Sequence, residues 1–437
     1  MMQTDAAPQV LVACPDARPP AYQAVIALAE AGRLDRFVTG FYHRGHGRAM
    51  EAARQLMPCQ FPRVRRQLMR RHERRIPTDR VSSLWSYDAA LQLEAKLAAR
   101  RPGSQHAVAR WRTRRFDRAT SRAIRQRRPG AAFLFSDVGS DLALPTCRRS
   151  GIPTLLSMVH GDVREERLIL DEEARHSPDF FPIYLGDGRL DLNELEWLHQ
   201  RRLRDIALAD RILVPSDHIA GELVRHGTPR DRIGVVPYAA DTRRFRPDPG
   251  KVAAEGRCTF LFAGGITQRK GIKYLLEAWR RVRRPGWTLQ LVGALPSDPG
   301  PLRPYLDEVD HLGRVGHAEM PAVMAAADVF VFPSLFEGSA VVTYEALAAG
   351  LPSIVTAAAG SVVRDGEEGL IVPSRAVDDL AAAMARLGES PDLRRRLAAA
   401  ARARAEAFDW PRYHASIIAE VDRVAATPAR PPGTTAR

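Results

Sequence analysis

The stretch Ala327–Gly350, ADVFVFPSLFEGSAVVTYEALAAG, decides the fold of this chain. Within it, Val329–Phe332 is a short, apolar and partly β-branched run that ends at Pro333. Such a run predicts a buried parallel strand followed by a loop. The segment Ala340–Ala349 then predicts a helix that stops at Gly350. A strand, a loop and a helix in this order are typical of an α/β protein with a parallel sheet.

The loop between that strand and that helix has features of a ligand site. Glu337-Gly338-Ser339 is a turn of small residues that leaves backbone N–H groups open at a helix N-terminus, and such a terminus suits a phosphate. The N–H groups belong to Ser339, Ala340 and Val341. Glu337 and Glu345 stand eight positions apart, and carboxylates accept hydrogen bonds from sugar hydroxyls. The ordinary alternative is a solvated loop glutamate and a glutamate on the polar face of an amphipathic helix.

Length and composition indicate a soluble, two-domain α/β protein. The 437 residues exceed one ordinary domain, and 45% hydrophobic and 27% charged residues are usual for a globular chain. The four cysteines are scattered and lack metal-binding spacing, which predicts reduced thiols. The first residues lack the pattern of a signal peptide, and no apolar run is long enough to span a bilayer. We therefore expect a cytoplasmic protein.

The net charge of +14 permits several partners: nucleic acid, an anionic membrane surface or an anionic substrate. All but four of the 65 cationic residues are arginine, so compositional bias also explains much of this charge. Arginine clusters occur at residues 63–75 and 110–115, within the region His43–Arg128. Apolar residues alternate with them, which predicts amphipathic helices that either lie on anionic lipid headgroups or form a solvated cover. No nucleic-acid-binding module accompanies the charge.

The rest of the N-terminal half alternates strands and helices. We expect strands at 9–13, 36–42, 131–136, 154–159, 211–216 and 234–237, with helices at 22–31 and 192–209 and one following the strand at 211–216. His160 follows a strand directly, at the sheet edge where ligands of open α/β sheets bind. An ordinary loop histidine is the alternative. Residues 163–190 are expected to be an irregular loop near the cleft that shapes an acceptor site.

The C-terminal half begins with a second candidate phosphate loop. The run Cys258–Ala263 predicts a strand, and Gly264-Gly265 after it lets the backbone approach a ligand. Arg269 and Lys270 then stand at the start of a helix from Ile272, although a plain turn with surface cations is the alternative. Further strands are expected at 288–292 and 353–356 and in 370–373, with helices from residues 378, 391 and 410.

The matching motifs carry a resemblance to retaining GT-B glycosyltransferases of the large family 4 type. The matches are Pro333-Ser334, Glu337-Gly338, Glu345-Ala346 and Gly350-Leu351-Pro352. The chain departs from the family at Ala239, where a glycine is usual, and at Gly265, where an arginine is usual. The resemblance covers residues 154–410 well and the first 151 residues only in strand order.

The resemblance implies roles for individual residues. Lys270, with Arg269 replacing the missing arginine, neutralises a diphosphate leaving group, and Glu345 holds ribose hydroxyls. Glu337 hydrogen-bonds the donor sugar, which His160 contacts from the other domain. The remaining expected binding residues are Gly264, Gly265, Gly293, Val315, Gly338, Ser339, Ala340 and Val341. Family members need no metal, so no metal ligand or cofactor is expected, and no protein nucleophile is assigned.

These inferences predict a GT-B fold with two doubly wound Rossmann-like domains facing across a cleft. The expected limits are 1–245 for an acceptor-side domain with a basic insert at about 43–128, 246–409 for a nucleotide-sugar domain, 410–427 for a crossover helix and 428–437 for a disordered tail. The expected reaction is retaining transfer of a hexose from a UDP- or GDP-sugar to a glycan, a lipid-linked acceptor or a small molecule, in surface polysaccharide or glycolipid synthesis. A GT-B epimerase or phosphorylase, or a non-catalytic cationic surface-binding protein, is the alternative.

Overall fold

The structure is a computed structural model that describes residues 7–15, 20–44, 71–100, 105–185, 191–251 and 255–427, with Gln55, Arg65, Leu68, Met69 and Gly103 as single positions. The chain divides into two compact units. The first comprises residues 1–158, 196–213 and 414–437, and the second comprises residues 159–195 and 214–413. The contiguous domain limits expected from the sequence stay a prediction. Most of the arginine run at 63–70 and the tail at 428–437 lie outside the described residues.

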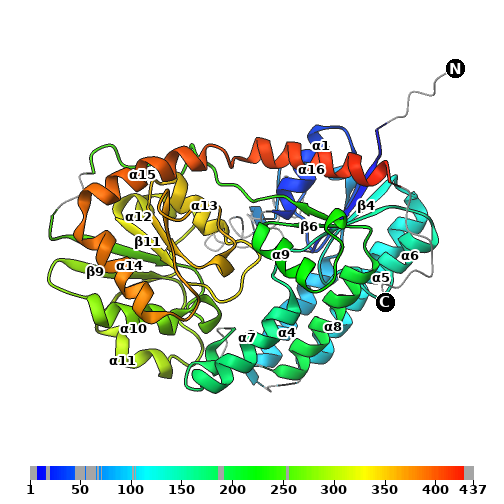
Figure 1. The fold of residues 1–437 in the computed structure, drawn as a ribbon. Coiled ribbons are helices and arrows are strands. Elements are labelled where there is room, and N and C mark those ends of the chain that lie inside the picture. The colour runs from blue at the N-terminus through cyan, green and yellow to red at the C-terminus, as the bar shows by residue number, and fades with distance from the viewer. Residues whose placement is uncertain are drawn as a thin grey trace. The chain divides into compact units, whose positions relative to one another are not determined.

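The first sheet has seven strands in the order β3-β2-β1-β4-β5-β6-β7. Figure 1 labels two of them, β4 and β6. The strands are β1 (Val10–Ala13), β2 (Leu34–Thr39), β3 (Val81–Ser83), β4 (Ala131–Phe135), β5 (Thr154–Ser157), β6 (Arg211–Val214) and β7 (Ile233–Val235). Each strand pair with a known register is parallel. Every residue of β1, β4, β5 and β6 is buried, as expected for parallel strands that are covered on both faces.

The second sheet has six strands in the order β10-β9-β8-β11-β12-β13. The strands are β8 (Cys258–Ala263), β9 (Trp287–Val292), β10 (Asp310–Gly313), β11 (Val329–Phe332), β12 (Ser353–Val355) and β13 (Gly369–Ile371), and all their pairs are parallel. The chain runs outward from β8 to β10 and then returns to β11 on the other side of β8. The gap between β8 and β11 is therefore the topological switch point, where ligands of such sheets bind.

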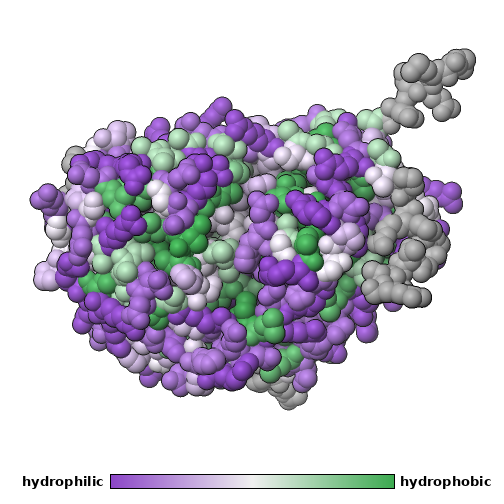
Figure 2. Space-filling model, viewed as in Figure 1, coloured by the Kyte–Doolittle hydropathy of each residue, from purple (hydrophilic) through white to green (hydrophobic). Residues whose placement is uncertain are grey.

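Helices connect the strands of both sheets. Along the first sheet they are α1 (Ala21–Glu30), α4 (Trp85–Arg100), α5 (Gln105–Arg127), α6 (Ala143–Arg149), α7 (Val163–His176), α8 (Leu192–Leu208) and α9 (Asp217–Arg225), with 3-10 turns η1 (Thr78–Arg80), η2 (Phe181–Ile183) and η3 (Arg230–Arg232). Along the second they are α10 (Ile272–Val282), α11 (Arg303–Leu306), α12 (Met320–Ala326), α13 (Val341–Ala348), α14 (Val377–Glu389) and α15 (Pro391–Ala405), with η4 (Gln268–Lys270), η5 (Gly300–Leu302) and η6 (Ala357–Ala359). The last helix is α16 (Trp410–Ala425), which belongs from residue 414 onward to the first unit. Among the described residues, no helix combines the length and the apolar character that a bilayer span requires. Hydrophilic residues cover most of the face seen in Figure 2.

The prediction of an irregular loop at 163–190 is wrong, because residues 163–176 form helix α7. Asp162 caps the helix by accepting a hydrogen bond from the Arg164 N–H at 2.9 Å. The inward positions follow helical spacing and are occupied by Val163, Glu166, Leu170 and Glu173. Two of these four residues are glutamates, so the sequence lacks the 3.6-residue repeat of apolar residues that would have indicated a buried helix face. The basic region also contains the edge strand β3, which the expectation of helices alone missed.

A buried carboxylate fixes the start of α6 in the first unit. Asp117 on α5 is fully buried and accepts three backbone N–H groups, from Asp141 (2.9 Å), Leu142 (3.0 Å) and Ala143 (2.8 Å). No side chain at the N-cap position of α6 does this itself. Asp117 therefore supplies the capping acceptor from a neighbouring helix.

Replacing Asp117 with alanine should lower the melting temperature by several degrees, because three backbone N–H groups at the start of α6 lose their acceptor. The expected loss is about 2–4 kcal/mol. Asp378→Ala serves as the control, since the Asp378 side chain is 93% exposed and its pair with Arg281 is a surface pair. Equal melting temperatures for the two variants would contradict a capping role for Asp117.

Candidate functional site

A cavity of about 640 Å³ lies at the switch point of the second sheet. Its walls come from the segments that follow β8, β9, β10 and β11 and from the helices α12 and α13. It is lined by Ala263, Gly264, Gly265, Lys270, Val292, Gly293, Ala294, Arg314, Val315, His317, Met320, Phe332, Glu337, Ser339, Ala340, Val341, Val342 and Glu345. Ten of the thirteen expected site residues line it. The exceptions are His160, Arg269 and Gly338.

Lys270 and Glu337 form an ion pair inside this cavity, between the loops after β8 and β11. Burial lowers the pKa of Lys270 and the charge of Arg269 lowers it further, while Glu337 acts in the opposite direction. Burial alone would raise the pKa of Glu337, but Lys270 and Arg269 outweigh this effect and hold that pKa below its usual value. The low pKa keeps Glu337 ionised near neutral pH, and the Lys270 side-chain nitrogen lies at a wall where an anion can replace or join this carboxylate.

Backbone contacts fix the position of this pair. The carbonyl oxygen of Arg269 accepts hydrogen bonds from the Leu335 N–H (2.8 Å) and the Ser334 hydroxyl (3.1 Å), so the two loops are joined directly. Gly271 follows in the left-handed region, with φ of 73°. A Cβ atom there would lie 2.0 Å from the carbonyl oxygen of Pro333, so the close approach of the loops requires a glycine.

Helix α13 presents its N-terminus to the cavity. No side chain caps it, and its first two residues, Val341 and Val342, line the cavity wall. The loop before the helix is held from behind, because the Ser339 hydroxyl donates to the Gly360 carbonyl at 2.6 Å and the Ala340 N–H donates to the Ala359 carbonyl at 3.2 Å. The positive end of a helix dipole and the Lys270 ammonium thus share one cavity, which suits a phosphate group.

Glu345 stands at the other side of the cavity. Burial raises the pKa of its carboxyl group to about 7, and Arg244 partly offsets this effect. The His317 Nε2 atom lies 3.4 Å from a Glu345 carboxylate oxygen. Since the carboxyl group lines the cavity, it can accept hydrogen bonds from hydroxyl groups of a ligand that enters.

His160 lies next to this site but not on the cavity wall. Its side chain is buried, and its Nδ1 atom donates to the Gly161 carbonyl at 2.8 Å. The loop that carries it packs on the β11 loop, because a Cβ atom on Gly338 would lie 2.3 Å from the Val159 carbonyl oxygen. Arg269 also lies off the wall, with its Nη2 atom 4.0 Å from Glu337.

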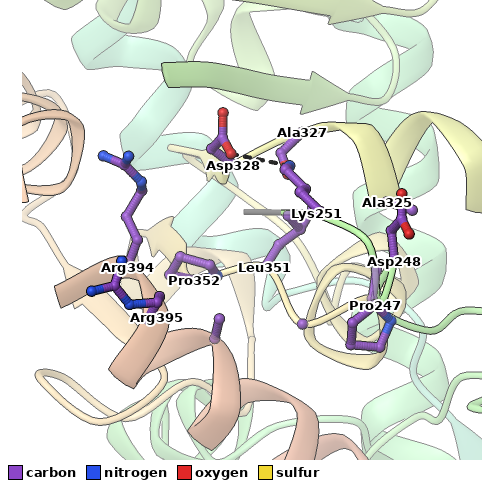
Figure 3. Close-up of a pocket in the computed structure, with 13 residues that line it drawn as sticks. Pro247, Asp248, Lys251, Ala325, Ala327, Asp328, Leu351, Pro352, Arg394 and Arg395 are labelled. Atoms are coloured by element: carbon purple, nitrogen blue, oxygen red, sulfur yellow. Dashed lines mark hydrogen bonds and ion pairs between the residues drawn. The ribbon is translucent and has the colours of Figure 1, made fainter. Parts of the chain in front are cut away.

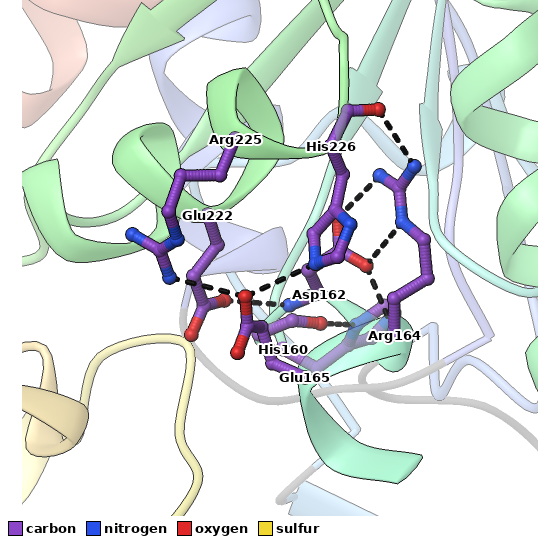
Figure 4. A network of polar contacts seen from close by, with 8 residues as sticks. His160, Asp162, Arg164, Glu165, Glu222, Arg225 and His226 are labelled. Atoms are coloured by element: carbon purple, nitrogen blue, oxygen red, sulfur yellow. Dashed lines mark hydrogen bonds and ion pairs between the residues drawn. The ribbon is translucent and has the colours of Figure 1, made fainter. Parts of the chain in front are cut away.

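A polar network holds the His160 loop (Figure 4). The Asp162 N–H donates to the carboxylate of Glu222 at 2.8 Å, and Arg164 donates to both Asp162 and the His226 carbonyl. Glu222 lies on α9, and that helix is capped by Ser216, whose hydroxyl donates to the Gly338 carbonyl at 3.0 Å. Helix α9 therefore contacts both the His160 loop and the β11 loop.

The expectations from sequence missed several wall residues. Phe332 forms part of the floor, with its ring centre 5.0 Å from the Lys270 ammonium, and Arg314, His317 and Met320 close one side. A signal for Phe332 was present, since it is the last residue of a buried strand at the switch point. The others follow β10, whose exposed and alternating pattern gives a weak signal.

A second cavity, of about 280 Å³, lies near α15 and is lined by Pro247, Asp248, Lys251, Ala325, Ala327, Asp328, Ala349, Gly350, Leu351, Pro352, Arg394, Arg395 and Ala398 (Figure 3). Lys251 lies 3.1 Å from Asp328, and Arg394 donates to the Leu387 and Gly388 carbonyls at 2.7 Å. These two cations are already paired within the protein, so this cavity is a weaker candidate for binding an anion.

Comparison with known proteins places residues 257–390 in the family described as "Glycosyl transferases group 1". The chain is 33% identical to the D-inositol 3-phosphate glycosyltransferase of Streptomyces scabiei over 232 residues, covering 47% of this chain and 52% of that protein. It is 33% identical to the MMP alpha-(1->4)-mannosyltransferase of Mycolicibacterium hassiacum over 208 residues, covering 45% and 49%. The chain thus spans about half the length of the curated relatives it matches.

Solved structures extend the comparison to nearly the whole chain. Sucrose-phosphate synthase from Thermosynechococcus elongatus matches with a TM-score of 0.67 at 18% identity, covering 96% of this chain and 99% of that one. Anabaena HepE in complex with UDP-glucose matches with a TM-score of 0.59 at 16% identity, covering 95% and 100%. The fold is therefore GT-B, as expected, and within it residues 257–390 match the family model of the glycosyl transferases group 1.

Glu345 gives a test of the site geometry that needs no ligand. Its raised pKa means that the folded protein keeps a proton that the unfolded chain, with a value near 4.5, has lost. The wild type therefore loses stability as the pH rises from about 4.5 to about 7. Glu345→Gln removes this loss, so the variant should gain up to about 3 kcal/mol relative to wild type between pH 5 and pH 8. Thermal melting of both proteins at pH 5 and at pH 8 measures this difference in stability.

The control for this measurement is Glu389→Gln, in a side chain that is 56% exposed. That substitution should shift the melting temperature equally at both pH values. If Glu345→Gln does the same, the carboxyl group is hydrated in solution and the buried wall described above is wrong.

Proposed function

We propose that this protein is a retaining glycosyltransferase of the family 4 type, which transfers a hexosyl group from a nucleoside diphosphate sugar. The observation that supports this most strongly is that three features converge on one cavity: the Lys270 ammonium, the open N-terminus of α13 and the Glu345 carboxyl group. A diphosphate needs the first two, and ribose hydroxyls need the third. The volume of about 640 Å³ is within the usual range for small-molecule sites.

In this proposal the donor phosphate lies between Lys270 and the N–H groups of Val341 and Val342. The bond between the anomeric carbon and the phosphate oxygen breaks, and the acceptor oxygen bonds to the same face of the sugar. The proton of the acceptor hydroxyl passes to the departing phosphate, so no protein nucleophile is required. Lys270 stabilises the charge that grows on the diphosphate, and the Arg269 guanidinium, whose Nη2 atom lies 4.0 Å from the Glu337 carboxylate, adds to this effect.

In this proposal, Glu337 and His160 contact the sugar of the donor. Glu337 is held by Lys270 and by the Ser334 hydroxyl at 3.4 Å, so the arrival of a diphosphate at Lys270 frees carboxylate lone pairs for sugar hydroxyls. His160 would contact the sugar through a small movement of its loop, which packs against Gly338. As expected from the sequence, the proposed donor is a UDP- or GDP-sugar, and the proposed acceptor is a glycan, a lipid-linked sugar or a small molecule. The proposal also includes a cytoplasmic location and a role in surface polysaccharide or glycolipid synthesis.

Replacing Lys270 with alanine should lower kcat by about 10²-fold or more and raise KM less, because the diphosphate gains charge as the glycosidic bond breaks. A panel of UDP- and GDP-sugars first identifies the donor, and initial rates then give both constants. Lys273→Ala is the matched control, since that lysine follows three positions later and contacts Ser177 (3.1 Å) rather than the cavity.

Lys270→Arg should recover part of the lost rate, which separates a charge effect from a damaged fold. A normal kcat for Lys270→Ala with the correct donor would rule out the phosphate role of this loop.

Activity should persist in EDTA, because protein cations and the α13 N-terminus supply the positive charge for the leaving group. In the part of the chain that the structure describes, no group of three or more His, Cys, Asp or Glu residues is arranged for a metal, yet metal independence remains a prediction. Turnover is measured with and without chelator after dialysis. Full loss that Mg²⁺ or Mn²⁺ reverses would show that a metal carries the leaving-group charge instead.

A further inference from the structure

Helices α4 and α5 of the first unit pack together, and α5 is unusually basic. It contains eight arginines and a single acidic residue, Asp117. Asp117 is fully buried and its carboxylate accepts hydrogen bonds from backbone N–H groups, so it does not balance the charge of the exposed arginines. The buried positions are Ala109, Phe116, Asp117, Thr120, Ser121 and Ile124. The arginines therefore lie mainly on the opposite, exposed side of the helix.

Two exposed arginines on α5 are not balanced by carboxylates. Some exposed arginines of the second unit do pair with carboxylates, as Arg281 does with Asp378 and Arg284 with Glu389. On α5, by contrast, Arg114 and Arg118 form no ion pair with any carboxylate among the described residues. Unbalanced cations that point to solvent favour an anionic partner.

Exposed aromatic side chains accompany these cations. Trp85 at the start of α4 is 70% exposed, and Trp111 on α5 is 50% exposed. Arg115 contacts Trp111 and the residue that follows Trp85, because its guanidinium lies 5.5 Å from the centre of the Trp111 ring and its Nε atom donates to the Ser86 hydroxyl at 2.8 Å. A tryptophan beside arginines is the combination that lies at the headgroup level of a bilayer.

A groove of about 590 Å³ runs along the same side of α5. It is lined by His106, Ala107, Arg110, Trp111, Arg114, Arg115 and Arg118. Helix α4, which packs against α5, exposes Leu91 (37%) and Leu93 (49%), aliphatic side chains that gain from contact with acyl chains. A single-stranded nucleic acid would use the arginines and stack on the tryptophans, but it would have no use for these leucines.

We propose that this face, defined by Trp85, Leu93, Trp111, Arg114, Arg115 and Arg118, docks on a membrane surface rich in anionic lipid. The arginines bind lipid phosphates, the tryptophans lie at the headgroup level, and the groove receives a headgroup. The proposal concerns a surface distinct from the cavity at the second sheet and does not depend on the transfer reaction.

The test measures binding of the full-length protein to vesicles by co-sedimentation. Vesicles of phosphatidylcholine with one quarter phosphatidylglycerol should bind it, and added salt should weaken binding. The double variant Arg114→Gln/Arg118→Gln should bind on the order of thirtyfold more weakly, at about tenfold per 1.4 kcal/mol and ~1 kcal/mol for each arginine. The control Arg281→Gln/Arg284→Gln removes the same charge from paired arginines and should change binding less than threefold.

Tryptophan fluorescence adds a readout of depth. Brominated lipid should quench the wild type more than Trp85→Phe/Trp111→Phe, because those two rings lie at the headgroup level. Equal binding to vesicles of pure phosphatidylcholine would overturn the proposal, as would equal losses for the two double arginine variants. Binding to polyuridylate RNA without binding to anionic vesicles would overturn it in favour of a nucleic-acid surface.

Discussion

The ion pair between Lys270 and Glu337 is the contact on which the arrangement of the cavity depends. It joins the segments after β8 and β11, the two strands that flank the switch point of the second sheet. A buried ion pair adds little net stability, but each partner is costly to leave alone. The pair therefore acts chiefly as a positioning device: it keeps the Lys270 side-chain nitrogen and the Glu337 carboxylate adjacent and facing the same cavity until a ligand exchanges one partner for another.

The surroundings of the pair are built from backbone rather than from long side chains. Ser334, Ser339 and Thr356 each donate a hydroxyl hydrogen bond to a carbonyl of another loop. Beneath them, Phe262 and Phe332 stack with ring centres 5.7 Å apart on adjacent strands. A site supported in this way has few rotatable bonds, so its geometry is largely set before a ligand arrives.

The sequence predicted the second sheet and its loops closely, because buried parallel strands appear as short apolar runs between glycines and prolines. The strands Cys258–Ala263 and Val329–Phe332 were predicted residue for residue. It failed at α7, where the inward positions Glu166 and Glu173 are glutamates, and at the edge strands β3 and β10, which are short and partly exposed. It could not place His160 off the cavity wall, because the path of a loop depends on contacts distant in sequence, here Glu222 and Ser216.

The contacts of helix α7 limit the sequence changes that the protein can tolerate. It begins beside the His160 loop, and Glu173 near its other end is fully buried, where it accepts hydrogen bonds from Tyr274 and Arg375, both at 2.7 Å. Since each residue of an α-helix turns the chain by about 100°, inserting or deleting one residue between Asp162 and Glu173 would carry that carboxylate away from its partners. Substitutions on the outer face of α7 are tolerable, whereas its length is fixed by what its two ends contact.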